Sequence, residues 1–323
     1  MMHSHADIRQ QPGHTDGSAP ELERGDFSKA VEASDASRLV VATYNIRYAV
    51  GSRLISGSLL RRLGFKRPSH RPRLVEENIR RAARAFDDGM RMPRADLIAL
   101  QEADRNTARA GGRHVARELA EALGMSYVRA AIRTPRVEQP KTRQWYLDFE
   151  ERIGMGEEGD TGVALLSRVP QSAAERIELP WSDCPWRPRL ALAATVPFGD
   201  GVLRVFNSHI DPHAGVSGQL KQHEAVLARA DETSAGGPVL LLGDFNTLSR
   251  EAREAARGLL ESEGYSTPLT NGVGTWRSGP IRLQADWIFV RRARVLRCGV
   301  ARRLSVSDHW PVWAEIAPEE ASN

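Results

Sequence analysis

The stretch VLLLGDFNT, residues 239–247, joins an apolar run of strand length to an aspartate and an asparagine. Consecutive branched apolar residues that end in a glycine are typical of a buried β-strand. Asp244 and Asn246 follow two residues apart, a spacing that directs both side chains to the same face of an extended chain. Because Asp and Asn also favour turns, this stretch alone indicates either a simple turn or one part of a functional site.

Six other apolar runs rich in Val, Ile and Leu predict further strands, at 39–44, 96–100, 162–166, 202–206, 287–290 and 311–316. Amphipathic helix patterns lie between them at 75–86, 115–122 and 252–260. Gly124 and Gly264 are placed to end two of these helices. Many strands with fewer helices predict an α/β protein in which two sheets pack face to face, with helices outside.

The chain of 323 residues is predicted to hold one domain, at 38–318, because no long linker divides that region. Residues 1–37 are polar and lack periodicity, so we expect a disordered N-terminal tail. Residues 319–323 are expected to form a short C-terminal tail. A composition of 41% hydrophobic and 27% charged residues is that of a soluble globular protein.

The sequence favours a cytoplasmic location. It has no apolar run of the roughly 18 residues that cross a bilayer, and its N-terminus lacks the order of a secretory signal. Its two cysteines, Cys184 and Cys298, provide no disulfide framework, which favours a reducing compartment. The net charge of +4 and a pI near 9.3 are compatible with an anionic partner.

Polar residues recur at the ends of the predicted strands. Each taken alone has a plain structural explanation, such as a turn, a cap or a solvated edge. Together they place carboxylates, amides and imidazoles at six strand ends, where a rigid scaffold can fix catalytic groups. They are Asn45, Glu102, His209, the pair Asp244 and Asn246, Asp286, and the pair Asp308 and His309.

These residue types favour metal-assisted hydrolysis. Carboxylate and amide oxygens suit Mg²⁺ or Mn²⁺, whereas Zn²⁺ sites usually use Cys or His. Two histidines can supply acid, base or phosphate contacts near neutral pH. The sequence contains no Walker loop, HExxH helix or GxSxG elbow, so an obvious covalent nucleophile is not indicated.

Seven short motifs occur in one order along the chain: ATYNIR (42–47), LIALQEAD (97–104), GVALLSRVP (162–170), FNSHID (206–211), LLGDFNT (241–247), ADWIFV (285–290) and SDHWPV (307–312). In these motifs the sequence resembles the endonuclease/exonuclease/phosphatase superfamily. That group includes DNase I-like nucleases, abasic-site endonucleases, neutral sphingomyelinases and inositol-polyphosphate 5-phosphatases. The resemblance implies a four-layered α/β sandwich of two mainly antiparallel sheets.

The resemblance also implies a role for each motif residue. A divalent ion, Mg²⁺ or Mn²⁺, would be surrounded by Asn45, Glu102 and Asp308, with Glu102 the principal ligand. Attack on the phosphorus would be in line, with the ion stabilising negative charge.

The remaining motif residues would act on water and phosphate. Asp244 would orient or deprotonate the attacking water, and Asn246 would hold the phosphate beside it. His209 would contact the phosphate or act as general acid. His309 would bind phosphate or transfer a proton, oriented by a hydrogen bond to Asp286.

Several features depart from the family pattern. Asp211 and His213 add an acid and an imidazole with no assigned role, and QLKQ (219–222) replaces an arginine-rich helix start. Two insertions, 49–73 and 134–160, are expected to set substrate choice. Within the first, basic and apolar residues interleave over 53–73. That pattern fits a nucleic-acid arm, a segment that lies on a membrane surface, or a solvated loop.

The sequence therefore predicts a Mg²⁺- or Mn²⁺-dependent phosphodiesterase that acts on an anionic phosphate ester, and a nuclease is one version of this hypothesis. The alternative is a phospholipid phosphodiesterase or phosphomonoesterase, similar to sphingomyelinases or phosphoinositide phosphatases, that acts at a membrane surface. A third hypothesis, a binding module on a decayed enzyme scaffold, is disfavoured because every polar motif position is filled.

Overall fold

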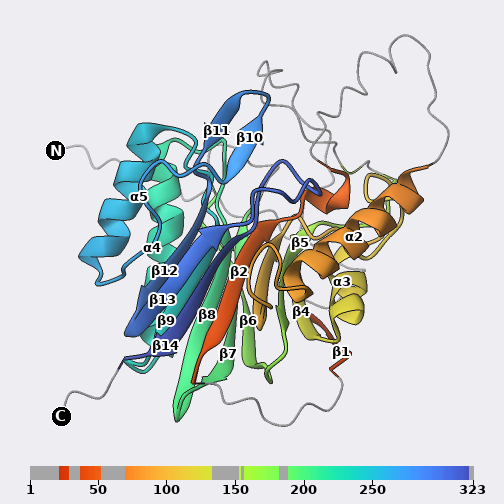
Figure 1. Cartoon of the computed structure of the whole chain (residues 1–323). Coiled ribbons are helices and arrows are strands. Elements are labelled where there is room, and N and C mark those ends of the chain that lie inside the picture. The colour runs from red at the N-terminus through yellow and green to blue at the C-terminus, as the bar shows by residue number, and fades with distance from the viewer. Residues whose placement is uncertain are drawn as a thin grey trace.

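Two β-sheets pack face to face and helices cover their outer faces, which gives the four layers seen in Figure 1. This computed structural model describes residues 22–28, 37–51, 70–132, 153, 156–181 and 188–319. The predicted α/β sandwich is confirmed. The other parts of the two predicted insertions and of the predicted tails lie outside the described residues.

The larger sheet, within the described residues, has seven strands in the order β1-β4-β5-β3-β2-β14-β13. Its neighbours are antiparallel except for the parallel pair β2 and β3. The strands are β1 (Leu22–Asp26), β2 (Leu39–Asn45), β3 (Leu97–Gln101), β4 (Ser126–Ala131), β5 (Gly162–Ser167), β13 (Ala293–Val300) and β14 (Val312–Pro318).

The smaller sheet has, in the same described ranges, five strands in the order β12-β9-β8-β7-β6, with β8 and β9 parallel. A separate two-stranded hairpin, β10–β11, projects beyond the strand ends. The strands are β6 (Ser172–Glu178), β7 (Leu190–Phe198), β8 (Gly201–His209), β9 (Val239–Asp244), β10 (Trp276–Ser278), β11 (Ile281–Leu283) and β12 (Asp286–Arg291).

Helices cover both sheets. α2 (Arg71–Asp87) and α3 (Val115–Leu123) lie on the larger sheet, and α4 (Val216–Thr233) and α5 (Arg250–Ser262) lie on the smaller one. The three predicted helices are confirmed as α2, α3 and α5, and α3 ends at Gly124, whose φ of 61° is left-handed. The apolar pattern does not reveal α4, because its buried face carries polar side chains: Gln219, Gln222 and His223.

Alternation along the strands divides the core. In β2, Leu39 and Val41 face the smaller sheet, whereas Ala42 and Tyr44 face the helices α2 and α3. All four are almost completely buried. A strand buried on both faces is apolar on both faces, which is why β2 reads as a continuous apolar run.

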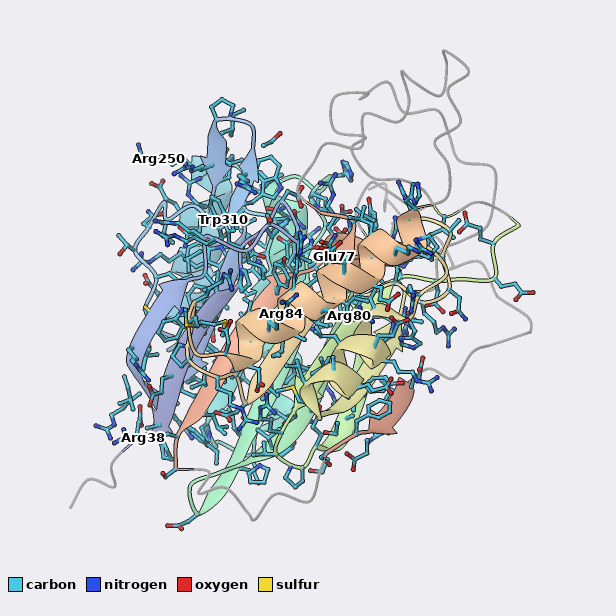
Figure 2. The ribbon with its side chains drawn as sticks, turned by 45° about the vertical axis from the view of Figure 1, so that its right-hand side comes forward. Arg38, Glu77, Arg80, Arg84, Arg250 and Trp310 are labelled. Atoms are coloured by element: carbon cyan, nitrogen blue, oxygen red, sulfur yellow. The ribbon has the colours of Figure 1, made fainter. Side chains whose placement is uncertain are left out.

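Charged residues occupy the outer face of α2, where Figure 2 labels Glu77, Arg80 and Arg84. Arg81 pairs with Glu77 one turn away, as i,i+4 neighbours do on a helix. None of the helices in the described part of the chain is long and apolar enough to cross a membrane.

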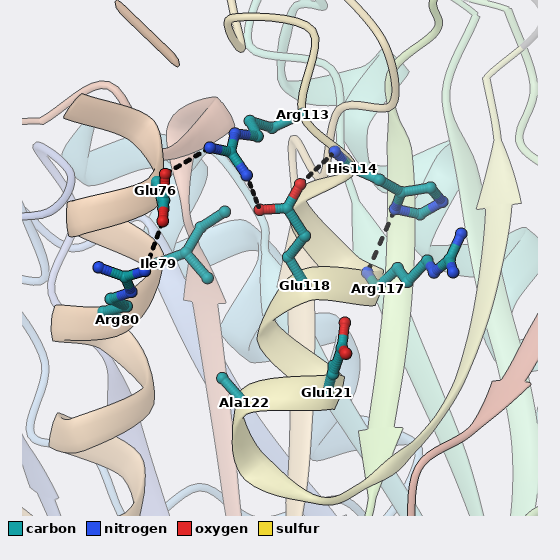
Figure 3. Close-up of a pocket in the computed structure, with 9 residues that line it drawn as sticks. All are labelled: Glu76, Ile79, Arg80, Arg113, His114, Arg117, Glu118, Glu121 and Ala122. Atoms are coloured by element: carbon teal, nitrogen blue, oxygen red, sulfur yellow. Dashed lines mark hydrogen bonds and ion pairs between the residues drawn. The ribbon is translucent and has the colours of Figure 1, made fainter. Parts of the chain in front are cut away.

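A cleft of about 470 Å³ lies between α2 and α3 (Figure 3). Its charges are largely paired with one another: Arg113 contacts both Glu76 and Glu118, the latter at 3.3 Å. The backbone N–H of His114 also donates to Glu118. These internal pairs make the cleft part of the scaffold, and it lies away from the polar strand ends predicted to form the site.

The prediction of a disordered segment over 1–37 is wrong for β1. Residues 22–26 pair antiparallel with β4, from Leu22 opposite Ala130 to Asp26 opposite Ser126. Composition did not reveal this strand because its side chains are mostly polar and its stability comes from one tertiary partner. Glu23 lies at that contact.

The Glu23 carboxylate links β1 to the larger sheet. It accepts hydrogen bonds at 2.7 Å from the Tyr127 hydroxyl and from His114 Nε2, and Arg105 Nη1 lies 3.3 Å away. Burial alone would raise the pKa of Glu23, but the hydrogen bonds from His114 and Tyr127 lower it from 4.5 to about 2. This carboxylate therefore favours the docked strand in its charged form.

Glu23→Gln should lower the free energy of unfolding by about 1–3 kcal/mol at pH 7, because it weakens a part-buried, charge-assisted network. Urea denaturation measures the change. Glu121→Gln, on the exposed face of α3, is the control and should change stability by less than about 0.5 kcal/mol.

The same variant carries a pH signature. The folded-state pKa of Glu23 lies below the unfolded value, so its contribution is complete above pH 4.5 and is lost as pH falls through about 2. The stability gap between wild type and Glu23→Gln should therefore narrow over that range. A gap that stays constant would contradict the proposed role of this carboxylate.

Candidate active site

The predicted site residues meet because six strand ends share one edge of the sandwich. The parallel pairs β2–β3 and β8–β9 end there, and the antiparallel strands β12 and β14 begin there. The register places His209 opposite Asp244, and Asp244 opposite Asp286. Three polar groups of the smaller sheet thus lie side by side on neighbouring strands.

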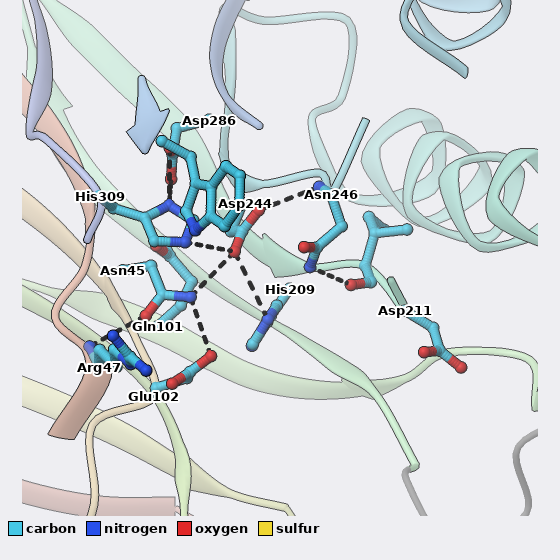
Figure 4. A network of polar contacts seen from close by, with 12 residues as sticks. Asn45, Arg47, Gln101, Glu102, His209, Asp211, Asp244, Asn246, Asp286 and His309 are labelled. Carbon is cyan, nitrogen blue, oxygen red and sulfur yellow. Dashed lines mark hydrogen bonds and ion pairs between the residues drawn. The ribbon is translucent and has the colours of Figure 1, made fainter. Parts of the chain in front are cut away.

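Asn45 joins the two sheets at this edge (Figure 4). Its side-chain amide N–H₂ donates to Glu102 Oε1 at 3.0 Å and to Asp244 Oδ2 at 2.9 Å. Its Oδ1 accepts the backbone N–H of Arg47 at 3.0 Å. In this arrangement the Asn45 side-chain nitrogen bridges two carboxylates, and its side-chain oxygen is occupied by the backbone N–H of Arg47.

Asp244 Oδ2 is the centre of the cluster. The Nε2 atoms of His209 and His309 each lie 3.7 Å from it, in addition to the Asn45 amide. Burial raises the pKa of Asp244 to about 6, although the charge of His309 acts in the opposite direction. A carboxylate in this setting can accept a proton.

His309 is oriented by Asp286, as predicted. Its Nδ1 donates to Asp286 Oδ2 at 2.8 Å, which leaves Nε2 directed toward Asp244. Burial would lower the pKa of His309, but Asp286 and Asp244 outweigh it and raise the pKa to about 10. Asp286 is itself fixed, because its backbone N–H donates to Thr275 Oγ1 at 3.0 Å.

Asn246 lies beside Asp244 in a strained turn. Its φ of 50° is left-handed, its backbone N–H donates to Asp244 Oδ1 at 3.0 Å, and its side chain donates to the Ile210 carbonyl at 2.8 Å. Gln219 of α4 donates to the Asn246 carbonyl at 3.1 Å and to the Asp211 carbonyl at 3.0 Å. The buried polar face of α4 therefore holds both loops in place.

The two residues without an assigned role lie on this second loop. Asp211 is buried, and its Oδ1 accepts the backbone N–H of His213 at 2.9 Å. Gln222 accepts the backbone N–H of Asp211 at 3.0 Å. These contacts give Asp211 a part in shaping the loop that follows His209.

Asp308 is turned toward Arg47. Its Oδ2 lies 3.1 Å from Arg47 Nη1 and accepts the Trp276 indole N–H at 3.2 Å. Within the described residues its carboxylate makes no hydrogen bond or ion pair with Asn45 or Glu102, the residues expected to share a metal with it. Arg47 and Trp276 were not predicted to take part in the site.

The chemistry of the donors fits a hard divalent cation. The ligand atoms of Asp244, Asp286 and His309 lie within 4.8 Å of one another, and all three residues are buried. Glu102 is linked to the same cluster by Asn45, whose side-chain amide donates to both Glu102 and Asp244. This grouping differs from the predicted set of Asn45, Glu102 and Asp308, whose ligand roles stay predictions.

Arg189 is a further site residue that the sequence did not reveal. It directly precedes β7, and its Nη1 lies 3.3 Å from both ring nitrogens of His209. The guanidinium is buried, and its Nε has no hydrogen-bond partner among the described residues. An arginine before a strand is common at a surface, so only the tertiary structure connects it to the site.

Close backbone approach and strain support the cluster. A Cβ on Gly243 would lie 2.0 Å from the Ser208 carbonyl oxygen, so only glycine lets β8 and β9 meet beside Asp244. Glu102 has a left-handed φ of 53°. Such strain in non-glycine residues is concentrated at functional sites.

A buried polar clamp lies beneath the site and connects the sheets. Asn207 of β8 donates to the carbonyls of Leu100 and Ala164 at 2.9 and 2.8 Å, and it accepts from Gln101 Nε2 at 2.7 Å. The Thr43 hydroxyl accepts a further bond from Gln101 at 3.1 Å. The clamp fixes the smaller sheet against the strands that carry Asn45 and Glu102.

A family model described as the Endonuclease/Exonuclease/phosphatase family matches residues 42–309. The chain belongs to this family. The resemblance seen in the sequence is thus confirmed, and members of the family are phosphoesterases. No curated protein matches the chain.

Solved structures show the same fold. A family member from Beutenbergia cavernae is 18% identical, with a TM-score of 0.60 over 88% of this chain and 72% of its own. ANGEL2, a 2′,3′-cyclic phosphatase solved with adenosine-2′,3′-vanadate, is 15% identical, with a TM-score of 0.55 over 94% and 100%. The human Nocturnin catalytic domain is 16% identical, with a TM-score of 0.54 over 92% and 98%. At these identities the likeness shows the fold alone.

Asn207→Leu should lower the free energy of unfolding by about 3 kcal/mol, because it leaves the Leu100 and Ala164 carbonyls and the Gln101 amide without their buried partner. Chemical denaturation measures the loss. Thr43→Val keeps the shape of the side chain and removes only the contacts between its hydroxyl and Gln101, of which the shorter is 3.1 Å, so its loss should be near 1 kcal/mol. Equal, small losses in both variants would show that Asn207 does not hold the sheets.

Proposed function

We propose that this protein is a divalent-metal-dependent phosphodiesterase in which Asp244 activates a water for in-line attack. The observation that supports the proposal best is the convergence on Asp244 Oδ2 of the Asn45 amide at 2.9 Å and of the His209 and His309 imidazoles at 3.7 Å. One oxygen of a buried carboxylate, surrounded by donors from both sheets, can orient a water while the donors face a phosphate.

The ion would be Mg²⁺ or Mn²⁺, and Glu102 would be its principal ligand. Asn45 and Asp308 would complete the set once their present contacts with Arg47 are exchanged. Asp244, Asp286 and His309 offer a second set of ligand atoms. When bound, the ion would neutralise negative charge on the phosphate oxygens.

The protein's own groups would carry the proton transfers. The water oxygen forms a bond to phosphorus and the bond from phosphorus to the leaving oxygen breaks. Asp244 takes one proton from the water, and His209 gives a proton to the leaving oxygen. His309, fixed by Asp286, donates a hydrogen bond to a non-bridging phosphate oxygen. No covalent intermediate with the protein is needed.

Two more donors would hold the phosphate. The guanidinium of Arg189 lies against His209, and one guanidinium can donate two parallel hydrogen bonds to two oxygens of a phosphate. Asn246 is held beside Asp244 by its backbone N–H, and its side-chain amide would turn from the Ile210 carbonyl to the phosphate. Both residues adjoin strands of the smaller sheet, whereas Glu102 follows a strand of the larger sheet. A phosphate between the two sheets would therefore be bound by groups from each of them.

A substrate panel tests the proposal. It contains single-stranded, double-stranded and abasic DNA, RNA, adenosine 2′,3′-cyclic phosphate, sphingomyelin vesicles, and matched p-nitrophenyl phosphodiester and phosphomonoester. We expect turnover of phosphodiesters with Mg²⁺ or Mn²⁺, loss of turnover in EDTA, and recovery when either ion is restored.

Each outcome of the panel assigns the protein to a class. Preference for the phosphomonoester, or turnover confined to vesicles, would replace the proposal with the alternative that acts on monoesters or lipids. Full activity in EDTA would contradict the metal requirement.

Glu102→Gln and His309→Ala should each reduce kcat/KM by more than about tenfold while circular dichroism and the thermal midpoint show a folded protein. Glu121→Gln changes a similar charge on the far surface of α3 and serves as the matched control. Rates like those of the wild type in both site variants would contradict the mechanism.

A further inference from the structure

The β10–β11 hairpin places two arginines directly opposite each other. Arg277 pairs with Arg282 in the antiparallel register. Their guanidinium carbons lie 5.3 and 5.8 Å from the centre of one indole ring, that of Trp310. Like charges opposite each other on neighbouring strands repel and destabilise the pairing. The stability of the hairpin therefore does not explain why two arginines occupy these opposite positions.

Neither arginine is neutralised within the described part of the chain. Arg277 and Arg282 form no ion pair there, whereas Arg80 of α2 and Arg250 of α5 each pair with a glutamate one turn away. Trp310 attracts both cations through its ring face but carries no negative charge. The hairpin therefore holds two positive charges over one indole ring, and neither of them forms an ion pair with a described carboxylate.

The hairpin is fixed to the site loop. The backbone N–H of Arg277 donates to the Asp308 carbonyl at 3.0 Å, and the backbone N–H of Trp310 donates to the Thr275 carbonyl at 2.7 Å. Trp276 pairs with His309 in an isolated bridge. The backbone of the hairpin that carries the two charges is therefore held next to the loop of Asp308 and His309.

We infer that Arg277 and Arg282 form a second phosphate site, which binds a phosphate group of the substrate other than the one that is hydrolysed. An anion placed between the two guanidinium groups would relieve their repulsion and accept hydrogen bonds from both. This inference rests on the proposed phosphodiesterase function. It assigns the substrate to esters that carry at least two phosphates, as a nucleic-acid strand does.

Four substrates test the inference. They are a dinucleotide with one phosphodiester, the same dinucleotide with a 5′-terminal phosphate, the same with a 3′-terminal phosphate, and a trinucleotide. The terminal phosphates and the added internucleotide phosphate distinguish the two sources of a second phosphate. For the wild type we expect kcat/KM to rise at least tenfold for one or more substrates with a second phosphate.

Arg277→Gln/Arg282→Gln should reduce this preference to about twofold or less. It should also make log KM for the preferred substrate depend less steeply on log salt concentration, because about one or two phosphate contacts are lost. Arg277→Lys/Arg282→Lys keeps both charges and should retain part of the preference. Removal of a repulsive pair should not lower the thermal midpoint, which checks that the variant is folded.

Arg80→Gln/Arg84→Gln is the matched control, since it removes the same charge from the outer face of α2. Figure 2 shows that face well apart from Trp310. This control should keep the full preference. A loss in both double variants would mean that net charge, and not a site, explains the effect, and would overturn the inference.

Two other results would also overturn the inference: a wild type that hydrolyses all four substrates equally well, or a hairpin variant that keeps the wild-type preference. If the wild type hydrolyses none of them, the proposed function fails separately. The second site is then judged by binding of a fluorescent trinucleotide in EDTA, where equal affinity of wild type and hairpin variant counts against it.

Discussion

The amide of Asn207 holds the two sheets in the one alignment on which the site depends. It forms three hydrogen bonds across a buried interface, to two carbonyls and one side chain of the larger sheet. Apolar packing alone tolerates small sliding movements between sheets, whereas buried polar partners must match atom by atom. The contact between Asn45 and Asp244 spans the same gap. Because the site uses side chains from both sheets, the relative positions of those side chains depend on the buried contacts that align the sheets.

Five strands buried on both faces were predictable from sequence, and so were the polar residues at their ends. β2, β3, β5, β9 and β12 read as continuous apolar runs because neither face meets water. β6 and β13 are largely half-buried or exposed and gave no such run, and β7 is rich in alanine, which suits helices as well as strands. α4 was hidden for the opposite reason, since it buries glutamines that carry no apolar period.

Residue identities at the site could be listed from the motifs, but their orientations could not. The sequence places Asp308 beside His309, yet the two side chains have different partners, Arg47 and Asp286. That division depends on where β2 and β12 lie relative to the loop before β14. Arg189 and the hairpin arginines carry no sequence signal, because an isolated arginine resembles any solvated surface residue until the fold supplies its neighbours.

The short strand β1 also has a consequence for self-association through the edge of the larger sheet. β1 occupies the outer edge of β4, so the backbone donors and acceptors of β4 are paired within the same molecule. The family match begins only at residue 42 and would suggest a domain without that strand. A chain shortened to begin at residue 38 would expose β4 as an open edge, and open edges recruit strands from other molecules. Self-association of such a shortened protein would then result from the loss of β1 from the edge of β4. It would not be evidence that the full chain forms an oligomer.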